Sequence, residues 1–341
     1  MVNRHFLRQK VLQSLYAYYT SGRDSIEKQE KFMYENISKL YDLEIYLLAV
    51  ILEIRNIEEN RIEEAKHKFY PTEEERNPNL RFVNNPFLQK LSNNEELQRA
   101  IERLHINYSF DREVLRLLLQ RFRQSDSYIE YMKQPIATYE DERKVITRLF
   151  KNFIMKSENI YDTICEKGFT WECDYEYVGQ VTLQFLKTWA EDESDQKPLP
   201  YPFDKSEEDV AENDRDFTKN LFRNTIKHAP EYDVYIDKRS QNWDKERLAF
   251  IDMLIIKMGI TEFIYCPSVP LRVSLNEYIE LAKEFSTEKS RLFVNGVLDR
   301  IITDLRIDNK IHKHEDEDLL FFETTEESKD TYSHFHARIK G

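Results

Sequence analysis

The chain has 341 residues, which is enough for two compact units or one large helical body. Its formal net charge is −13 at pH 7, with 63 Asp and Glu against 50 Lys and Arg. This balance excludes a protein that binds nucleic acid by being basic all over, so any RNA contact must be local. Only 6 Gly and 10 Pro are present, which favours helices over a large sheet with many tight turns.

The cysteines and the apolar runs indicate a cellular compartment. Cys165, Cys173 and Cys266 form neither a CxxC pair nor an even disulfide set. The N-terminus lacks the apolar core of a signal peptide. The longest apolar run, residues 45–54, contains Glu53 and is shorter than the roughly 20 residues that cross a bilayer. We therefore expect a cytoplasmic protein without a membrane span.

Helical patterns fill the first half of the chain. Apolar residues recur at helical spacing over residues 4–19, and a second helix is expected over residues 27–60. The charged, proline-containing stretch 63–81 is predicted to be a loop. Further helices are predicted at residues 95–108, 112–123 and 140–167.

A change of composition suggests where the chain divides. Residues 191–216 carry an acidic run, three prolines and little apolar surface, which is typical of a linker. On this basis we expect an N-terminal helical region over 1–190 and a C-terminal bundle over 217–310. The charged stretch 311–341 is expected to be a tail.

Three helices joined by short turns are predicted in the C-terminal part. The first spans about 248–263 and ends before Pro267, because proline lacks a backbone donor and restricts the residue before it. Ser274 and Glu277 have the S-x-x-E spacing of a capping box, which predicts the start of the second helix. An apolar stripe over 294–305 predicts the third helix, and together the three make a bundle.

At these residues the chain resembles the NusB family. The matching strings are Arg247-Leu248, Ile251-Asp252, Lys257, Glu262-Phe263, Val269-Pro270, Val273-Ser274-Leu275-Asn276-Glu277, Glu280-Leu281-Ala282-Lys283 and Phe293-Val294-Asn295-Gly296-Val297-Leu298-Asp299. Residues 8–16 are similar to the family's arginine-rich first helix. Typical members are less than half as long, and the added material lies between the first helix and Trp243. The resemblance implies an all-α fold of NusB-type helical bundles, in which an extra helical region precedes the C-terminal bundle.

The resemblance also implies a function. NusB proteins bind the single-stranded boxA element of nascent ribosomal RNA together with a NusE-type ribosomal protein. With other Nus factors and RNA polymerase they prevent premature termination and support rRNA synthesis. Such a factor breaks no bond, so we expect no catalytic residue, no cofactor and no enzymatic activity.

Two groups of residues are expected to bind RNA by phosphate neutralisation and base stacking. In the first helix, Arg4, His5 and Arg8 would face phosphates, and Tyr16 matches an RNA-contacting tyrosine of the family. The alternative is that Tyr16 packs in the core and the arginines are simply solvated.

The second group lies at the start of the last helix. Lys289, Arg291, Phe293 and Asn295 combine a helix N-terminus, positive charge and an aromatic ring. Gly296 costs about 1 kcal/mol relative to alanine inside a helix, so close approach of RNA or of a neighbouring helix is expected there. For Phe293 the alternative is core packing.

Two acidic residues are expected to bind the protein partner. Asp252 aligns with an acidic position that contacts the NusE-type protein in the family, and Glu262 lies near the end of the same helix. An unpaired carboxylate is costly to bury, so Asp252 should face a partner or an ion pair. The alternative for both residues is an internal ion pair with Lys257 or Arg247.

Other functional classes find little support. The stretch 312–315, His-Lys-His-Glu, is more simply a solvated tail than a metal site, so no metal is expected. The sequence has no GxGxxG, GxxxxGK[ST] or HExxH motif. An rRNA methyltransferase with a NusB-like domain is disfavoured, because nothing after Lys310 is long enough for a catalytic domain. A protein-protein scaffold that keeps the fold without RNA binding is the remaining alternative.

Overall fold

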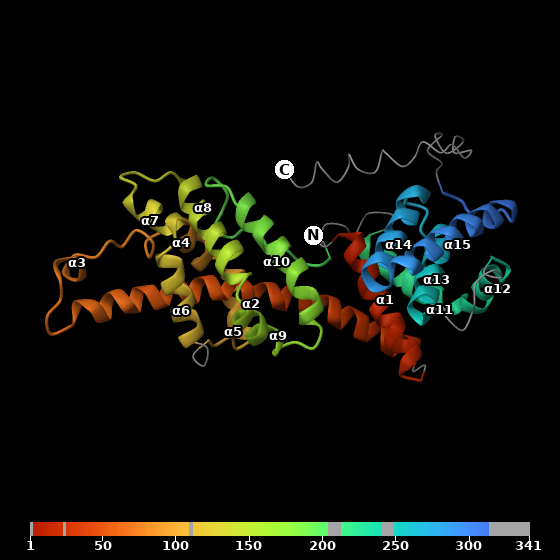
Figure 1. The fold of residues 1–341 in the computed structure, drawn as a ribbon, viewed down its shortest axis with the longest axis horizontal. Coiled ribbons are helices and arrows are strands. Elements are labelled where there is room, and N and C mark those ends of the chain that lie inside the picture. The colour runs from red at the N-terminus through yellow and green to blue at the C-terminus, as the bar shows by residue number, and fades with distance from the viewer. Residues whose placement is uncertain (1–2, 23–24, 109–111, 204–212, 240–248, 314–341) are drawn as a thin grey trace. The chain divides into compact units, whose positions relative to one another are not determined.

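A computed structural model gives the fold of the chain. It describes residues 3–22, 25–108, 112–203, 213–239 and 249–313, and these form helices with no β-strand among them (Figure 1). The predicted all-α fold class is therefore confirmed.

The chain divides into two compact units, and we describe each by itself. Unit 1 consists of residues 1–10 and 31–208, and unit 2 of residues 11–30 and 209–341. The first two helices, α1 (Arg4–Thr20) and α2 (Ile26–Lys66), therefore contribute residues to both units. The domain boundaries expected from the sequence remain a prediction, because the linker residues 204–212 lie outside the described part.

Unit 1 is built around α2, the long orange helix of Figure 1, whose apolar residues between Ile37 and Ile62 are mostly buried. Its other helices are α3 (Glu73–Arg76), α4 (Pro86–Ser92), α5 (Glu95–Arg103), α6 (Arg112–Arg123), α7 (Asp126–Lys133), α8 (Tyr139–Leu149), the π-helical η1 (Phe150–Ile154), α9 (Glu158–Cys165) and α10 (Trp171–Thr188). α8 packs against α4, α7 and α10. The helices α4, α7 and α10 were not expected from the sequence.

Capping side chains explain why unit 1 has many short helices. Asn94, Ser125 and Ser157 each accept a hydrogen bond from a backbone N–H in the first turn of α5, α7 and α9 respectively. The predicted loop 63–81 is shorter than expected, because α2 continues to Lys66 and Thr72 and Glu75 form a capping box for α3.

The described first part of the expected linker is bound to unit 1. The amide nitrogen of Asn94 donates to the carbonyl oxygens of Asp195 (2.8 Å) and Lys197 (2.9 Å). Glu96 accepts a hydrogen bond from the backbone N–H of Leu199, whose side chain is buried. Residues 191–203 therefore pack against the helical body even though their composition is that of a linker.

Unit 2 is a bundle around α13 (Phe250–Tyr265), which is buried on most of its surface. It packs against α11 (Asp214–Lys227), α12 (Ala229–Arg239), α14 (Leu271–Phe285) and α15 (Glu288–Ile307). Gly259 permits this packing, because a Cβ there would lie 2.9 Å from Leu298 Cδ2 on α15 and 3.4 Å from Tyr278 Cδ2 on α14. A β-carbon at that position would require the buried Leu298 side chain to shift within the packed core.

The predicted capping box of the second C-terminal helix is wrong. α14 begins at Leu271 with Pro270 before it, so Ser274 lies inside the helix and is buried. Its hydroxyl accepts a hydrogen bond from Nζ of Lys313 (2.8 Å), which also donates to the carbonyl oxygen of Val269 (2.8 Å). A residue 39 positions along the chain thus takes the place of the expected cap interaction.

Candidate nucleic-acid interface

An exposed aromatic cluster lies in unit 2 between α1 and the start of α13. The ring of Phe250 lies 5.8 Å from that of Tyr16 and 5.9 Å from that of Tyr19, centroid to centroid. Tyr16 and Phe250 are each 45% exposed. Rings that are held by one another and still open to solvent can stack on unpaired bases. Phe250 was not singled out from the sequence, because nothing in the pattern shows that it meets Tyr16.

The cationic start of α1 lies in unit 1 and is less open than expected. Arg4 and His5 are half-buried, whereas Arg8 is only 2% exposed. Lys10 is also buried and forms an ion pair with Asp174 at 2.5 Å. Arg8 therefore does not present its guanidinium at an open surface in this structure.

The start of α15 carries the second expected group. Thr287 caps the helix by accepting a hydrogen bond from the N–H of Ser290 (3.2 Å). Lys289 is exposed beside this helix N-terminus, and Arg291 forms an ion pair with Glu288. An exposed cation next to free helix N–H groups suits an anion.

Two further residues of this group differ in their surroundings. Phe293 is 2% exposed, which favours the alternative of core packing in unit 2 over stacking on RNA. Asn295 is half-buried on the same helix. Gly296 is exposed, and a Cβ there would meet nothing within 4 Å. Packing against a neighbouring helix therefore does not explain this glycine among the described residues.

The two acidic residues expected to bind a partner are both buried. Glu262 is 0% exposed and accepts a hydrogen bond from the Tyr278 hydroxyl on α14 at 2.6 Å. Asp252 is 1% exposed in the first turn of α13, and its Oδ1 has no hydrogen-bond partner among the described residues. An ion pair between Asp252 and Lys257 is not formed, because Lys257 pairs with Asp233 at 2.8 Å. Both residues are interior in this structure rather than part of an open docking surface.

A groove between α14 and α15 in unit 2 was not expected from the sequence. Its cavity volume is about 380 Å³, and arginines 272, 300 and 306 line it together with the apolar side chains of Leu271 and Ile302. Burial raises the pKa of Asp299, which also lines this groove. The three arginines are 28 and 6 positions apart, which explains why no local motif indicated the groove.

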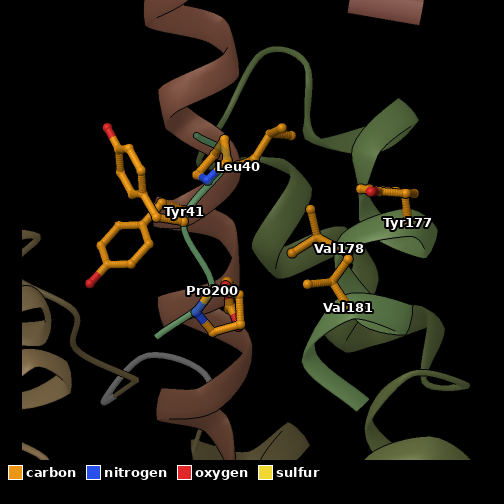
Figure 2. A pocket seen from close by; sticks show the side chains of 9 residues that line it. Leu40, Tyr41, Tyr177, Val178, Val181 and Pro200 are labelled. Atoms are coloured by element: carbon orange, nitrogen blue, oxygen red, sulfur yellow. The ribbon is translucent and has the colours of Figure 1, made fainter. Parts of the chain in front are cut away.

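A small pocket in unit 1 contains a buried carboxyl group (Figure 2). Tyr41, Tyr177 and Pro200 line it, and Glu44 at its wall is 2% exposed with an Oε1 that has no hydrogen-bond partner among the described residues. Burial raises the pKa of Glu44 well above its usual range. The free volume is about 10 Å³, which is room for one water and not for a cofactor.

Trp243 and several residues of the matching strings and of the candidate metal motif lie outside the described part of the chain. These are Trp243, Arg247, Leu248, His314 and Glu315. Within the described ranges, no group of three or more His, Cys, Asp and Glu side chains could hold a metal ion. No helix of the same ranges is long and apolar enough to cross a membrane.

The bundle and the exposed aromatic cluster define an all-helical protein with a candidate surface for unpaired bases. Comparison with known proteins agrees with the resemblance of its sequence. The sequence profile of the NusB family matches residues 177–303, from α10 into α15. The chain belongs to the NusB family.

Three relatives carry the name transcription antitermination protein NusB. The protein of Natranaerobius thermophilus is 32% identical over 123 residues, which are 36% of this chain and 88% of the relative. The protein of Salinibacter ruber is 43% identical over 99 residues, 29% of this chain and 62% of the relative. That of Chloroherpeton thalassium is 37% identical over 99 residues, 29% of this chain and 47% of the relative. No solved structure matches the chain significantly.

Proposed function

We propose that the chain is a transcription antitermination factor that binds boxA-type single-stranded RNA of nascent rRNA together with a NusE-type ribosomal protein. Its membership of the NusB family and the name shared by its relatives support this role. The matches span 62% and 47% of the first two relatives, so the activity and partners are inferred for this chain and not transferred as a whole.

The observation that carries the proposal is the exposed pair Tyr16 and Phe250. The resemblance predicts a base-stacking role for Tyr16, and its ring is 45% exposed instead of packed in the core. Stacking of one base on such a ring contributes about 1–3 kcal/mol. The Phe250 ring, which also contacts Tyr19, packs against the Tyr16 ring, so less side-chain entropy is lost when a base binds.

Positive charge would complete the interface. Lys289 at the capped start of α15 is exposed and would neutralise a phosphate. The arginines of the α14/α15 groove offer further phosphate contacts in the same unit. Arg4, His5, Arg8 and Asn295 stay predicted contacts, although the burial of Arg8 makes it the weakest of them.

A NusE-type ribosomal protein, other Nus factors and RNA polymerase are the proposed partners. The buried carboxyls of Asp252 and Glu262 do not offer a ready docking surface for them. If the partner uses these positions, it acts through the backbone and side chains around them.

A mobility-shift assay with boxA RNA, with and without the NusE-type protein, tests the proposal. Tyr16→Ala should weaken RNA binding by about 5- to 150-fold, which corresponds to the loss of one stacked base. Tyr16→Phe should retain binding, because the ring remains. Tyr70→Ala, which removes an 85% exposed tyrosine from unit 1, is the matched control and should have no effect.

A protein scaffold without RNA binding is the second candidate. The burial of Arg8 and Phe293 favours it, because two expected RNA contacts are not displayed. It predicts that the chain binds the NusE-type protein but shifts no boxA RNA at any salt concentration. That result would replace the first proposal.

A further inference from the structure

Unit 1 contains a charged groove that the family resemblance does not account for. It lies between the C-terminal half of α2 and α6, and its cavity volume is about 590 Å³. Four arginines line it, Arg61 from α2 and Arg112, Arg116 and Arg123 from α6. Such a concentration of guanidinium groups stands out in a chain whose net charge is −13.

The acidic side chains near the groove do not neutralise it. Glu58 is 2% exposed and accepts two hydrogen bonds from Arg61, at 2.7 and 2.9 Å. The Nε of Arg123 lies 3.4 Å from the same carboxylate and is buried without a hydrogen-bond partner among the described residues. The Glu58 carboxylate thus lies beside two guanidiniums, and among the described residues Glu64 is the one acid that lines the groove.

Two of the arginines are available for a ligand. Arg112 and Arg116 are exposed, and neither has an ion-pair or hydrogen-bond partner within the described ranges. They are four positions apart on α6, and Gln120 and Arg123 continue the same helix face. The helix rise places these side chains in a row about 16 Å long, with roughly 6 Å between Arg112 and Arg116.

The chemistry of this row matches a strand of phosphates. Guanidinium groups bind phosphate oxygens with paired, charge-assisted hydrogen bonds. Asn60 and Gln120 add neutral donors at the same lining. Among the described residues, no aromatic side chain lines the groove, so the described lining offers no ring on which a base could stack. The described apolar lining consists of Ile57 and Leu119, which is little surface for the apolar anchor residues of a peptide ligand.

We propose that this arginine groove is a second RNA site, which binds the phosphate backbone of an RNA strand without reading its sequence. The inference rests on the proposed function in that RNA is the ligand of the chain. The extra helical region would then bind the part of the RNA strand that flanks the boxA-type element, while unit 2 recognises the element itself. A polyanion of another class, such as an acidic protein segment, is an outcome of the test below.

The test uses the full chain and fluorescence anisotropy with two RNAs, a 20-nucleotide oligouridylate and boxA RNA. Arg112→Gln/Arg116→Gln removes the two available guanidiniums and keeps their polarity. Arg121→Gln is the matched control, because Arg121 is exposed on the same helix and does not line the groove. Circular dichroism establishes that both variants keep the helical content of the wild type.

The expected result is a change of salt dependence. Each lost phosphate contact reduces the log–log slope by about 0.7, so the double variant should have a slope smaller by about 1.4 for oligouridylate. When the salt concentration rises from 50 to 200 mM, the affinity of the wild type should fall by a factor about seven times larger than that of the double variant. Arg121→Gln should match the wild type.

The outcomes separate this inference from the proposed function. If the double variant keeps the wild-type slope while boxA RNA still binds, the groove is not an RNA site and the proposed function stands. If boxA RNA binds no better than oligouridylate but the double variant has a smaller salt-dependence slope, the groove is an RNA site and the proposed function fails. If poly-glutamate binding depends on Arg112 and Arg116 while the RNA slope does not, the groove serves an acidic protein and our inference is overturned.

Discussion

The ammonium group of Lys10 lies 2.5 Å from Oδ1 of Asp174, and both side chains are almost completely buried. Burial lowers the pKa of Lys10 and raises the pKa of Asp174, because each charge has lost its water. The Oδ2 of Asp174 is buried without a hydrogen-bond partner among the described residues. Each charge therefore depends on the other, while the pair as a whole is costly to bury.

Removing one partner of this pair should be far worse than removing both. Asp174→Ala leaves a buried ammonium and should lower the free energy of unfolding by about 3–5 kcal/mol. Lys10→Met/Asp174→Leu replaces the pair with apolar side chains and should recover most of that loss. Urea denaturation followed by far-UV circular dichroism measures both values. Equal decreases in the free energy of unfolding for the single and the double variant would contradict this account.

Glu44 should make stability decrease with rising pH. Its pKa is raised in the folded chain, so the unfolded chain ionises first. The folded state is fully favoured below the unfolded pKa of about 4.3 and loses stability as the pH rises toward the folded pKa. Glu44→Gln should remove this dependence and be more stable than the wild type at pH 8. The midpoint of urea unfolding at pH 5 and pH 8 checks this, with exposed Glu35→Gln as the control. A constant difference between Glu44→Gln and wild type at both pH values would contradict it.

Gly296→Ala should stabilise the chain but weaken RNA binding. Alanine is favoured by about 1 kcal/mol inside a helix, and its methyl group would meet nothing within 4 Å. A gain in melting temperature is therefore expected. If RNA approaches the helix backbone here, the same methyl group should reduce boxA affinity in the mobility-shift assay. An unchanged affinity would remove Gly296 from the proposed interface.

Lys313 should stabilise unit 2 through the two oxygens that it binds. Lys313→Met keeps the length and removes the ammonium, so the carbonyl of Val269 and the hydroxyl of Ser274 lose a donor. We expect a loss of about 1–3 kcal/mol in the free energy of unfolding. Lys310→Met is the control, because Lys310 lies over the Tyr235 ring at 5.3 Å and is not buried. If both variants lose the same free energy of unfolding, the buried contacts of Lys313 do not cause the destabilisation.

Glu262→Gln should affect folding more than partner binding. The glutamine retains an oxygen that can accept the Tyr278 hydroxyl, so the loss should be modest, whereas Glu262→Leu should be clearly less stable. Once folded, both should bind the NusE-type protein like the wild type, since the side chain is 0% exposed. Isothermal calorimetry compares the affinities. A folded Glu262→Gln chain that no longer binds the partner would restore the predicted contact.

Helices with one strong apolar stripe could be predicted from the sequence, and contacts between distant residues could not. The bounds of α6 agree with the expected range 112–123, because its apolar positions follow the helical period closely. The expected helix 140–167 is instead divided into α8, η1 and α9, because Ser157 caps a new start within a continuous pattern. At Ser157 the capping hydrogen bond starts a new helix, although the apolar pattern continues through this position.

The candidate site shows the same limit. Tyr16 could be singled out through the family resemblance, yet its neighbour Phe250 is 234 positions away and no pattern connects the two. Phe293, Asp252 and Glu262 carry residue types that suit an interface but are buried. Residue type alone does not say which face of a helix is covered, because that depends on the helices packed against it.

The buried amides of Asn85 and Asn94 connect helix starts to distant parts of unit 1. Each caps a helix with its oxygen and cross-links a distant segment with its nitrogen; Asn85 Nδ2 donates to Glu142 Oε2 at 2.7 Å. An aspartate at position 85 would keep the capping oxygen but would lose the donor and place a second carboxylate beside Glu142. A substitution that helix prediction would score as harmless would therefore loosen unit 1 from within.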